Sequence, residues 1–191
     1  MLIVFEGIDG CGKNTHITLL QGEYDFEVLK FPREKYSLLG DFLRGNVEIN
    51  RKALFLLFLS DITDGISEIS KINKPVFLDR YFFSTIAYEV DGIEYETAKK
   101  IVNSLSLPKP DGVILLDIPP EISYERKVAQ KGLDRYERDV EYLRRVRGNF
   151  LKLYEEKFYT ENWFLIDGNR PIMEVYKDVK EVIEKLGIRK G

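Results

Sequence analysis

Short apolar segments alternate with longer segments of mixed apolar and polar residues along the chain. The short segments are apolar at nearly every position, which is typical of strands buried on both faces of a parallel sheet. Strands are predicted at residues 2–7, 26–31, 75–81, 112–118 and 163–168. In the longer segments apolar residues recur at helical spacing, as Leu54, Phe58, Ile62 and Ile66 do. Helices are predicted at residues 13–23, 36–45, 50–73, 83–105 with a break near Gly92, 120–130, 138–158 and 171–186.

Strands that alternate with helices predict an α/β fold, in which a parallel sheet is covered by helices on both faces and the crossovers are right-handed. In such sheets ligands bind beyond the carboxyl ends of the strands. Three predicted strands end in charged sequences: "EGIDGCGKN" from residue 6, "KFPRE" from residue 30 and "LDRYFFS" from residue 78. We therefore expect these three sequences to meet in one crevice that holds the functional site.

The first of these sequences nearly matches the phosphate-binding pattern G-x-x-x-x-G-K-[ST], with Gly7, Gly12 and Lys13 in place. Glycines let successive backbone N–H groups point at a polyphosphate, the following helix adds its own N–H groups, and the lysine supplies a positive charge. A glycine-rich turn without a ligand is the alternative, but the strand before the loop and the helix after it favour phosphate binding. The residues expected to hold a donor nucleotide in this loop are Gly7, Ile8, Asp9, Gly10, Cys11, Gly12, Lys13 and Asn14.

Asn14 stands where the pattern has a Ser or Thr whose hydroxyl reaches a magnesium ion. An amide oxygen is a neutral and bulkier ligand, and a helix turns the adjacent Thr15 about 100° away. Asp79 ends a buried strand beside the loop, where a water-bridged Mg²⁺ site needs a carboxylate, although a surface salt bridge is the alternative. We expect Asp79 and Asn14 to hold Mg²⁺, with Asn14 as the weaker ligand.

Basic residues follow the second and third strand ends, where Arg33 and Arg80 can each present a guanidinium to the oxygens of an acceptor phosphate. Residues 126–138, "RKVAQKGLDRYER", are predicted to form a basic lid that brings charge to a migrating phosphoryl group and excludes water. A solvated helix end is the alternative for this segment. His16 and Cys11 are interpreted as a helix-face residue and a small loop residue rather than as catalytic groups.

The composition limits the classes of protein that fit. A chain of 191 residues with 44% hydrophobic and 32% charged residues indicates a single globular domain over residues 1–191. A net charge of −3 gives no basic field for nucleic acid, and no apolar run is long enough to span a membrane. The single cysteine excludes an internal disulfide, and the first residues do not resemble a signal peptide, so we expect a cytoplasmic protein.

Together these sequences resemble the thymidylate kinase family of nucleoside monophosphate kinases. The segments that carry the resemblance are "FEGIDGCGK" (5–13) for the phosphate loop, "FPR" (31–33) and "DRYFFSTIAY" (79–88) for acceptor binding, "LPKPDGVILLDI" (107–118) and "WFLIDG" (163–168) for later strands, and "GLDRYE" (132–137) for the lid. They occur in order over nearly the whole chain. The resemblance implies a P-loop NTPase-type five-stranded parallel sheet with a lid, a homodimer, and transfer of the ATP γ-phosphate to dTMP with Mg²⁺, giving dTDP.

The resemblance also implies roles for individual residues. On the acceptor side, Asp9 would bind the 3′-hydroxyl, Arg33 and Arg80 the phosphate, Phe58 the base, and Tyr88 the sugar, with Ser84 beside them. Lys13, Arg80 and Arg135 would neutralise charge during transfer, whereas Arg126 and Lys131 would contact ATP. Because Gly10 and Cys11 are neutral, the lid rather than the loop must supply the additional basic group.

Three residues depart from the family pattern: Asn14, His16 and Ile62, the last of which stands where an arginine commonly reads the thymine edge. Losing a hydrogen-bond donor should weaken discrimination between bases. The alternatives left open are a kinase of broader specificity for deoxynucleotides or deoxynucleosides, and a nucleotide-binding regulatory protein without turnover.

Overall fold

The structure, a computed structural model, describes residues 1–130 and 140–190 and gives no side-chain placement for residues 127–130. Five strands form one parallel sheet in the order β2-β3-β1-β4-β5. The strands are β1 (Leu2–Glu6), β2 (Glu27–Lys30), β3 (Val76–Asp79), β4 (Gly112–Asp117) and β5 (Trp163–Asp167). The helices are α1 (Lys13–Gln21), α2 (Ser37–Leu43), α3 (Arg51–Ile69), α4 (Phe82–Ala87), α5 (Tyr95–Ser104), α6 (Pro120–Gln130), α7 (Val140–Glu155) and α8 (Ile172–Lys185). The expected five-stranded parallel α/β fold is confirmed.

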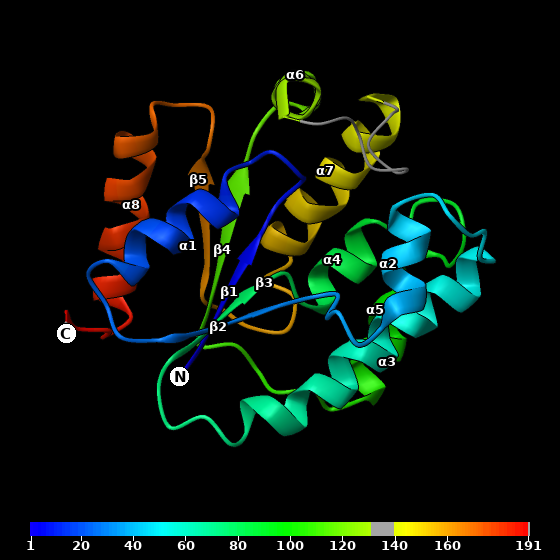
Figure 1. Ribbon diagram of the computed structural model, residues 1–191, viewed down its shortest axis with the longest axis horizontal. Coiled ribbons are helices and arrows are strands. Elements are labelled where there is room, and N and C mark those ends of the chain that lie inside the picture. Colours follow the sequence, from blue (N-terminus) through cyan, green and yellow to red (C-terminus); the bar gives the residue numbers. More distant parts are fainter. Residues whose placement is uncertain (131–139, 191) are drawn as a thin grey trace.

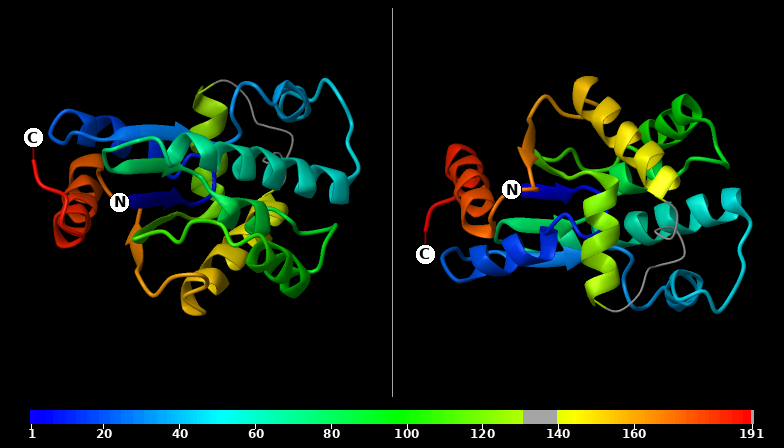
Figure 2. Two further views of the ribbon diagram at one scale, coloured as in Figure 1. Left: turned by 90° about the horizontal axis from the view of Figure 1, so that it is seen from below. Right: turned by 90° about the horizontal axis from the view of Figure 1, so that it is seen from above.

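Helices cover both faces of the sheet (Figure 1). Helices α1 and α8 lie on one face, and α4 and α7 pack together on the other, with α3 and α5 outside them. Helix α6 lies across the carboxyl end of the sheet, as the right-hand view of Figure 2 shows. Both chain termini lie on the same side of the molecule, away from that end.

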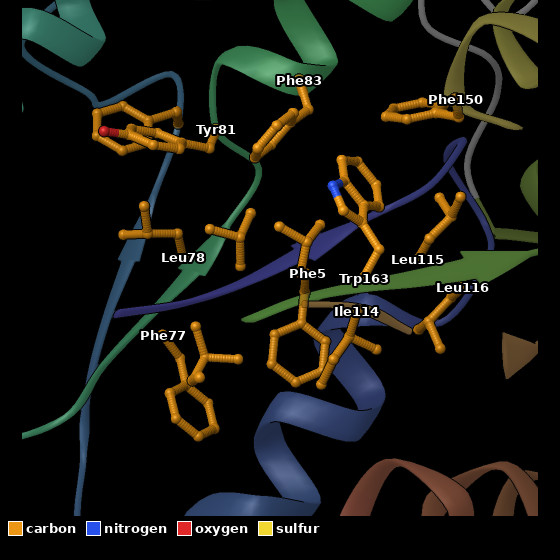
Figure 3. Close-up of a cluster of buried hydrophobic side chains, with 14 of the residues drawn as sticks. Phe5, Phe77, Leu78, Tyr81, Phe83, Ile114, Leu115, Leu116, Phe150 and Trp163 are labelled. Atoms are coloured by element: carbon orange, nitrogen blue, oxygen red, sulfur yellow. The ribbon is translucent and has the colours of Figure 1, made fainter. Parts of the chain in front are cut away.

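The alternation of side chains along each strand divides the core between the two faces (Figure 3). Phe5 and Phe77 point to the α1 face, whereas Leu78, Leu115 and Trp163 point to the α4 and α7 face. These five side chains are at most 7% exposed. The central strands are therefore buried on both faces, as their continuous apolar sequences predict.

The two edge strands differ from that expectation. Glu27 and Lys30 of β2 are exposed, as are Leu165 and Asp167 of β5. An edge strand has a neighbour on only one side, so the helices that cover the sheet do not bury it completely. None of the helices within residues 1–130 and 140–190 has the length and apolar character needed to span a membrane.

The predicted break near Gly92 is a seven-residue interruption: α4 ends at Ala87 and α5 begins at Tyr95. The side chain of Glu89 turns back there, and its Oε1 accepts a hydrogen bond from the backbone N–H of Ile93 at 3.0 Å. A Cβ atom at Gly92 would lie 2.0 Å from the same oxygen. A side chain at position 92 is therefore excluded unless this turn changes.

Candidate nucleotide-binding site

A cavity of about 1120 Å³ opens at the carboxyl ends of β1, β2 and β3. It begins beside Arg170 and Ile172, passes the phosphate loop, and ends beside Tyr36, which precedes α2, and Phe58 of α3. A cavity for one drug-sized ligand measures roughly 300–1000 Å³. The predicted convergence of the three charged strand ends is correct, and the space they enclose exceeds that needed by one such ligand.

The phosphate loop has the tight backbone path that its glycines predict. Gly7 and Gly12 have φ angles of 136° and 101°, in the left-handed region that side chains disfavour. A Cβ at Gly7 would lie 2.3 Å from the carbonyl oxygen of Leu116. Lys13 begins α1, and its buried Nζ donates to the carbonyl of Gly7 at 3.1 Å. The same Nζ contacts Cys11 Sγ at 3.5 Å, so the ammonium group lies over its own loop, where a bound phosphate can replace these partners.

Arg80 lies beside this loop, at the end of β3. Its Nη2 forms an ion pair with Asp9, and its Nη1 donates to Ser84 Oγ at 2.9 Å. The guanidinium also lies over the ring of Tyr88, with 5.1 Å between its central carbon and the ring centroid. Burial raises the pKa of Tyr88, so its hydroxyl stays protonated as a neutral donor. Four predicted site residues are thus brought together at one point of the cavity.

Asp79 has a carboxylate that suits a cation. The residue is 4% exposed, and its Oδ1 is buried with no hydrogen-bond partner among the described residues. Its Oδ2 lies 3.5 Å from Nζ of Lys30, which is mostly exposed. A buried carboxylate oxygen without a donor is costly unless a ligand satisfies it. Asn14 lines the same cavity and is exposed.

Within residues 1–130 and 140–190, no group of three or more His, Cys, Asp or Glu side chains could hold a metal ion. The donor set at Asp79 is therefore small. It fits Mg²⁺, which keeps several waters and is commonly bound by one or two carboxylates together with substrate phosphates.

Arg33 lines the cavity, but its guanidinium contacts acidic side chains of α3. Its Nε donates to Asp61 Oδ1 at 2.7 Å, its Nη2 to Asp64 at 2.5 Å, and its Nη1 to Glu68 Oε1 at 2.5 Å. The backbone N–H of Arg33 also donates to Asp61 Oδ2 at 2.8 Å. These contacts fasten the segment after β2 to α3. Binding of a phosphate by Arg33 stays a prediction, and any phosphate must compete with three carboxylates.

The other end of the cavity is mainly apolar. Phe58 and Ile62 line it from α3, together with Leu54, Phe55 and Leu43. Ile62 is only 2% exposed. A flat aromatic base can pack in such a space, and Ile62 offers it no hydrogen-bond donor.

Arg126 of α6 closes the cavity near the loop. Its Nη1 donates to the carbonyl of Gly10 at 3.0 Å, and its Nη2 donates to the carbonyl of Gly168 at 3.2 Å. Three residues earlier, Ser123 Oγ donates to the carbonyl of Asp9 at 2.6 Å. The helix that leads into the predicted lid is thus joined to the phosphate loop by side chains.

Comparison with known proteins agrees with this geometry. The family model for thymidylate kinase matches residues 5–179. The chain belongs to the thymidylate kinase family. The thymidylate kinase of Thermosipho africanus is 34% identical to it, over 97% of this chain and 98% of that protein. The probable thymidylate kinase of Archaeoglobus fulgidus is 36% identical, over 100% and 99% of the two chains.

A solved structure shares the fold. The thymidylate kinase of Candida albicans superposes with a TM-score of 0.76 and 24% sequence identity, covering 96% of this chain and 91% of that chain. The family resemblance found in the sequence is therefore confirmed, and so is the P-loop kinase fold that it implied.

Two features of the site were not predicted from the sequence, namely the burial of His16 and of Glu6. His16 is on a helix face, as expected, but that face is buried: the residue is 3% exposed, and its ring stacks on Tyr176 with 6.5 Å between the ring centroids. Burial, and then the charge of Arg126, lower its pKa. Glu6 is fully buried beside the site. The one sequence feature that could have indicated this burial is its position at the end of an apolar strand.

The predicted lid falls largely outside the described residues. Arg126 is placed, but Lys131 and Arg135 lie in residues 131–139, which the structure does not describe. Their expected contacts with ATP and with the migrating phosphate stay predictions.

Proposed function

We propose that this member of the thymidylate kinase family transfers the γ-phosphate of ATP to dTMP, giving ADP and dTDP. The observation that carries the proposal is that Lys13 on the phosphate loop and the Arg80–Asp9 pair share one cavity. A donor polyphosphate on the loop and an acceptor monophosphate at Arg80 would then lie next to each other. Family membership supports the same reaction.

Catalysis by this site is mainly alignment and charge neutralisation. The phosphate oxygens of dTMP are already anionic near neutral pH, so no side chain has to remove a proton. Lys13 neutralises the β- and γ-phosphates, and Arg80 holds the acceptor phosphate through its planar guanidinium. Holding the two substrates together removes much of the entropic barrier to their reaction. Arg135 would add charge from the lid.

Roles for the remaining residues follow from where they line the cavity. Asp9 and Tyr88 lie beside Arg80, which suits contact with the deoxyribose, and Ser84 lies next to them. Phe58 lines the apolar end that suits the base. Arg126, beside Gly10 and Gly168, suits contact with ATP, and Lys131 would extend that contact from the lid.

Mg²⁺ would be held by Asp79 and by the substrate phosphates, with the Asn14 amide nearby. The burial of Asp79 and its Oδ1, which has no partner among the described residues, support this assignment. The ion would neutralise phosphate charge, which is what Mg²⁺ supplies in phosphoryl transfer generally.

A homodimer is proposed because α3 and α5 form a groove that is apolar over part of its length. Its apolar part is lined by Leu56 and Leu59 of α3, Ile101 of α5 and Leu105 just after α5, and Leu56 is 55% exposed. Ser60, Thr63 and Asp64 of α3 line the rest. Light scattering during size-exclusion chromatography tests this: the mass should be twice 22.3 kDa, and Leu56→Glu should lower it to that of the monomer. A monomeric wild-type protein would contradict the proposal.

The acceptor is tested directly by incubating the protein with Mg-ATP and each of dTMP, dUMP, dCMP, dGMP, UMP and thymidine. ADP and the phosphorylated nucleotide are then quantified by chromatography. The highest kcat/KM is expected with dTMP. Comparable use of several monophosphates would indicate broader specificity, preference for thymidine would indicate a nucleoside kinase, and no acceptor-dependent ADP would indicate a protein without turnover.

A further inference from the structure

Glu6 is a fully buried carboxylate at the end of β1 that lines no part of the cavity described above. Its side chain points to the α4 face of the sheet, because the neighbouring Phe5 points to the α1 face. Its Oε1 accepts from the backbone N–H groups of Tyr81 at 2.8 Å and Ser84 at 3.3 Å. Its Oε2 accepts from Ser84 Oγ at 2.5 Å.

These contacts connect Glu6 to the acceptor site through one hydroxyl. Ser84 Oγ donates its single proton to Glu6 and accepts from Arg80 Nη1 at 2.9 Å. Arg80 itself has a left-handed backbone, with φ of 74°. A residue with a side chain holds this conformation only where surrounding contacts impose it. The hydrogen bond to Tyr81, the next residue, is one such contact.

The charge of Glu6 determines the direction of these hydrogen bonds. A carboxylate only accepts, so the Ser84 hydroxyl proton points to Glu6 and its lone pairs face Arg80. An amide in the same place would put an NH₂ group opposite Ser84. The Ser84 hydroxyl proton would then have to turn away from the glutamine at position 6. That rotation disturbs the Ser84 oxygen as the acceptor of the hydrogen bond from Arg80 Nη1.

The surroundings of Glu6 make it a carboxylate above about pH 7. Burial beside the apolar Leu115 of β4 raises its pKa to about 7, and Arg80 at the end of β3 and Lys13 of α1 oppose a larger rise. A buried carboxylate with three donors and two nearby cations is a satisfied group, not an accidental one.

We propose that Glu6 is a positioning residue, which orients the Ser84 hydroxyl and the Arg80 backbone and thereby aims the Arg80 guanidinium at the acceptor phosphate. The proposal rests on the proposed function, since it takes Arg80 to bind the phosphate of dTMP. Glu6 itself contacts neither substrate.

The test compares wild type with Glu6→Gln, Ser84→Ala and the double variant. For each, kcat and KM are measured with dTMP and with ATP above about pH 7, where Glu6 is a carboxylate, and dTMP binding is measured by titration calorimetry without ATP at the same pH. In Glu6→Gln we expect kcat/KM for dTMP to fall about 10- to 100-fold, because small displacements of an aligned group have effects of that size. The dissociation constant of dTMP should rise at least about 10-fold, while the KM for ATP should change less than about 2-fold. Because both substitutions break the same connection, the double variant should be no worse than the more impaired single variant.

Asp111→Asn serves as the matched control. Its carboxylate also accepts from the backbone of β1, at the N–H of Leu2 and a distance of 2.6 Å, but at the opposite end of the strand. It should leave kcat/KM for dTMP unchanged. Circular dichroism and melting temperature establish whether each variant is folded. If Glu6→Gln does not fold, Glu6→Asp replaces it: the charge is kept but the shorter side chain cannot hold the Ser84 hydroxyl in the same place, so dTMP binding should weaken without a change in the KM for ATP.

Three results would overturn the inference: unchanged dTMP binding in Glu6→Gln and Ser84→Ala, equal losses for dTMP and ATP, or additive effects in the double variant. A wild-type protein that neither binds nor phosphorylates dTMP would instead overturn the proposed function, and the role of Glu6 in dTMP binding with it.

Discussion

The guanidinium of Arg80 forms an ion pair with the carboxylate of Asp9, which joins the end of β3 to the phosphate loop. Arg80 also donates to Ser84 Oγ and lies over the ring of Tyr88. Within the cavity, the end of β3 is therefore held directly against the phosphate loop. A guanidinium with this many contacts has a fixed orientation before any substrate binds, which lowers the cost of aligning one.

Arg80→Lys should show how much depends on that geometry. Lysine keeps the charge but lacks the planar fork that contacts Asp9 and Ser84 and that we propose to hold the acceptor phosphate. We expect kcat/KM for dTMP to fall at least about 100-fold, with little change in the KM for ATP. Steady-state kinetics measure this, with Arg145→Lys on the surface of α7 as the control. An Arg80→Lys protein with near-normal kinetics would mean that only the charge matters.

Asn14→Ser restores the hydroxyl that the phosphate-loop pattern contains. If Asp79 and the substrate phosphates hold Mg²⁺, the rate should stay similar or rise, and less Mg²⁺ should be needed for half the maximal rate. The measurement is a Mg²⁺ titration at saturating ATP and dTMP, with Asn14→Ala as the control for loss of the side chain. A large loss of rate in Asn14→Ser would show that the amide has a specific role.

Ile62→Arg tests the apolar end of the cavity. Ile62 lines it and has no hydrogen-bond donor, so in the proposed binding mode discrimination among pyrimidines at this position rests on shape. An arginine there should increase the ratio of kcat/KM for dTMP to kcat/KM for dCMP, roughly 10-fold or more. Ile62→Met, which changes shape but adds no donor, should leave the ratio within about 2-fold. An unchanged ratio in Ile62→Arg would mean that the residue at position 62 takes no part in selecting the base.

Gly65→Ala should destabilise the protein. A Cβ at Gly65 of α3 would lie 2.8 Å from the ring of Phe31, in the segment that Arg33 fastens to the same helix. Overpacking of this kind costs about 1–3 kcal/mol, so the free energy of unfolding should fall by that amount. Urea denaturation measures it. Gly148→Ala is the control, because a Cβ at Gly148 of α7 would meet no heavy atom of the described residues within 4 Å, and there alanine should be neutral or stabilising.

The buried carboxylate of Glu6 predicts a pH dependence of stability. Burial raises its pKa from 4.5 to about 7, against the lowering effect of Ser84 and the nearby cations. The folded protein therefore binds the proton more tightly than the unfolded chain, and this contribution to stability is lost as pH rises from about 4.5 through about 7. A change of that size corresponds to about 3 kcal/mol.

Glu6→Gln cannot titrate and should lack this contribution. The difference in free energy of unfolding, variant minus wild type, should grow as pH rises from about 4.5 to about 7 and stay level above that. Urea denaturation at a series of pH values measures the difference. A difference that does not change with pH would mean that Glu6 keeps an ordinary pKa.

The fold and the centre of the site were predictable because local patterns determine them. Buried strands are continuously apolar, so the ends of β1 and β3 and the residues Lys13, Asp79 and Arg80 could be located from the sequence. The partners of Arg33 could not be predicted from the sequence. Asp61 and Glu68 lie 28 and 35 residues away and contact Arg33 only after α3 packs beside the segment that follows β2.

The burial of single polar residues could not be predicted from the sequence either. His16 is covered by Tyr176 of α8, far along the chain, and no local pattern links the two. Glu6 reads as one charged residue at the end of an apolar strand, and its three hydrogen bonds come from residues 75 to 78 positions away.

The most direct test of the proposed reaction is a nucleotide balance. Wild type and Lys13→Ala are incubated with Mg-ATP and dTMP, and ATP, ADP, dTMP and dTDP are separated and quantified over time. Wild type should form ADP and dTDP in equal amounts. Lys13→Ala should form neither at a comparable rate, since it lacks the positive charge that neutralises the migrating phosphate. ADP formed without dTDP, or equal rates in the two proteins, would contradict phosphoryl transfer to dTMP at this site.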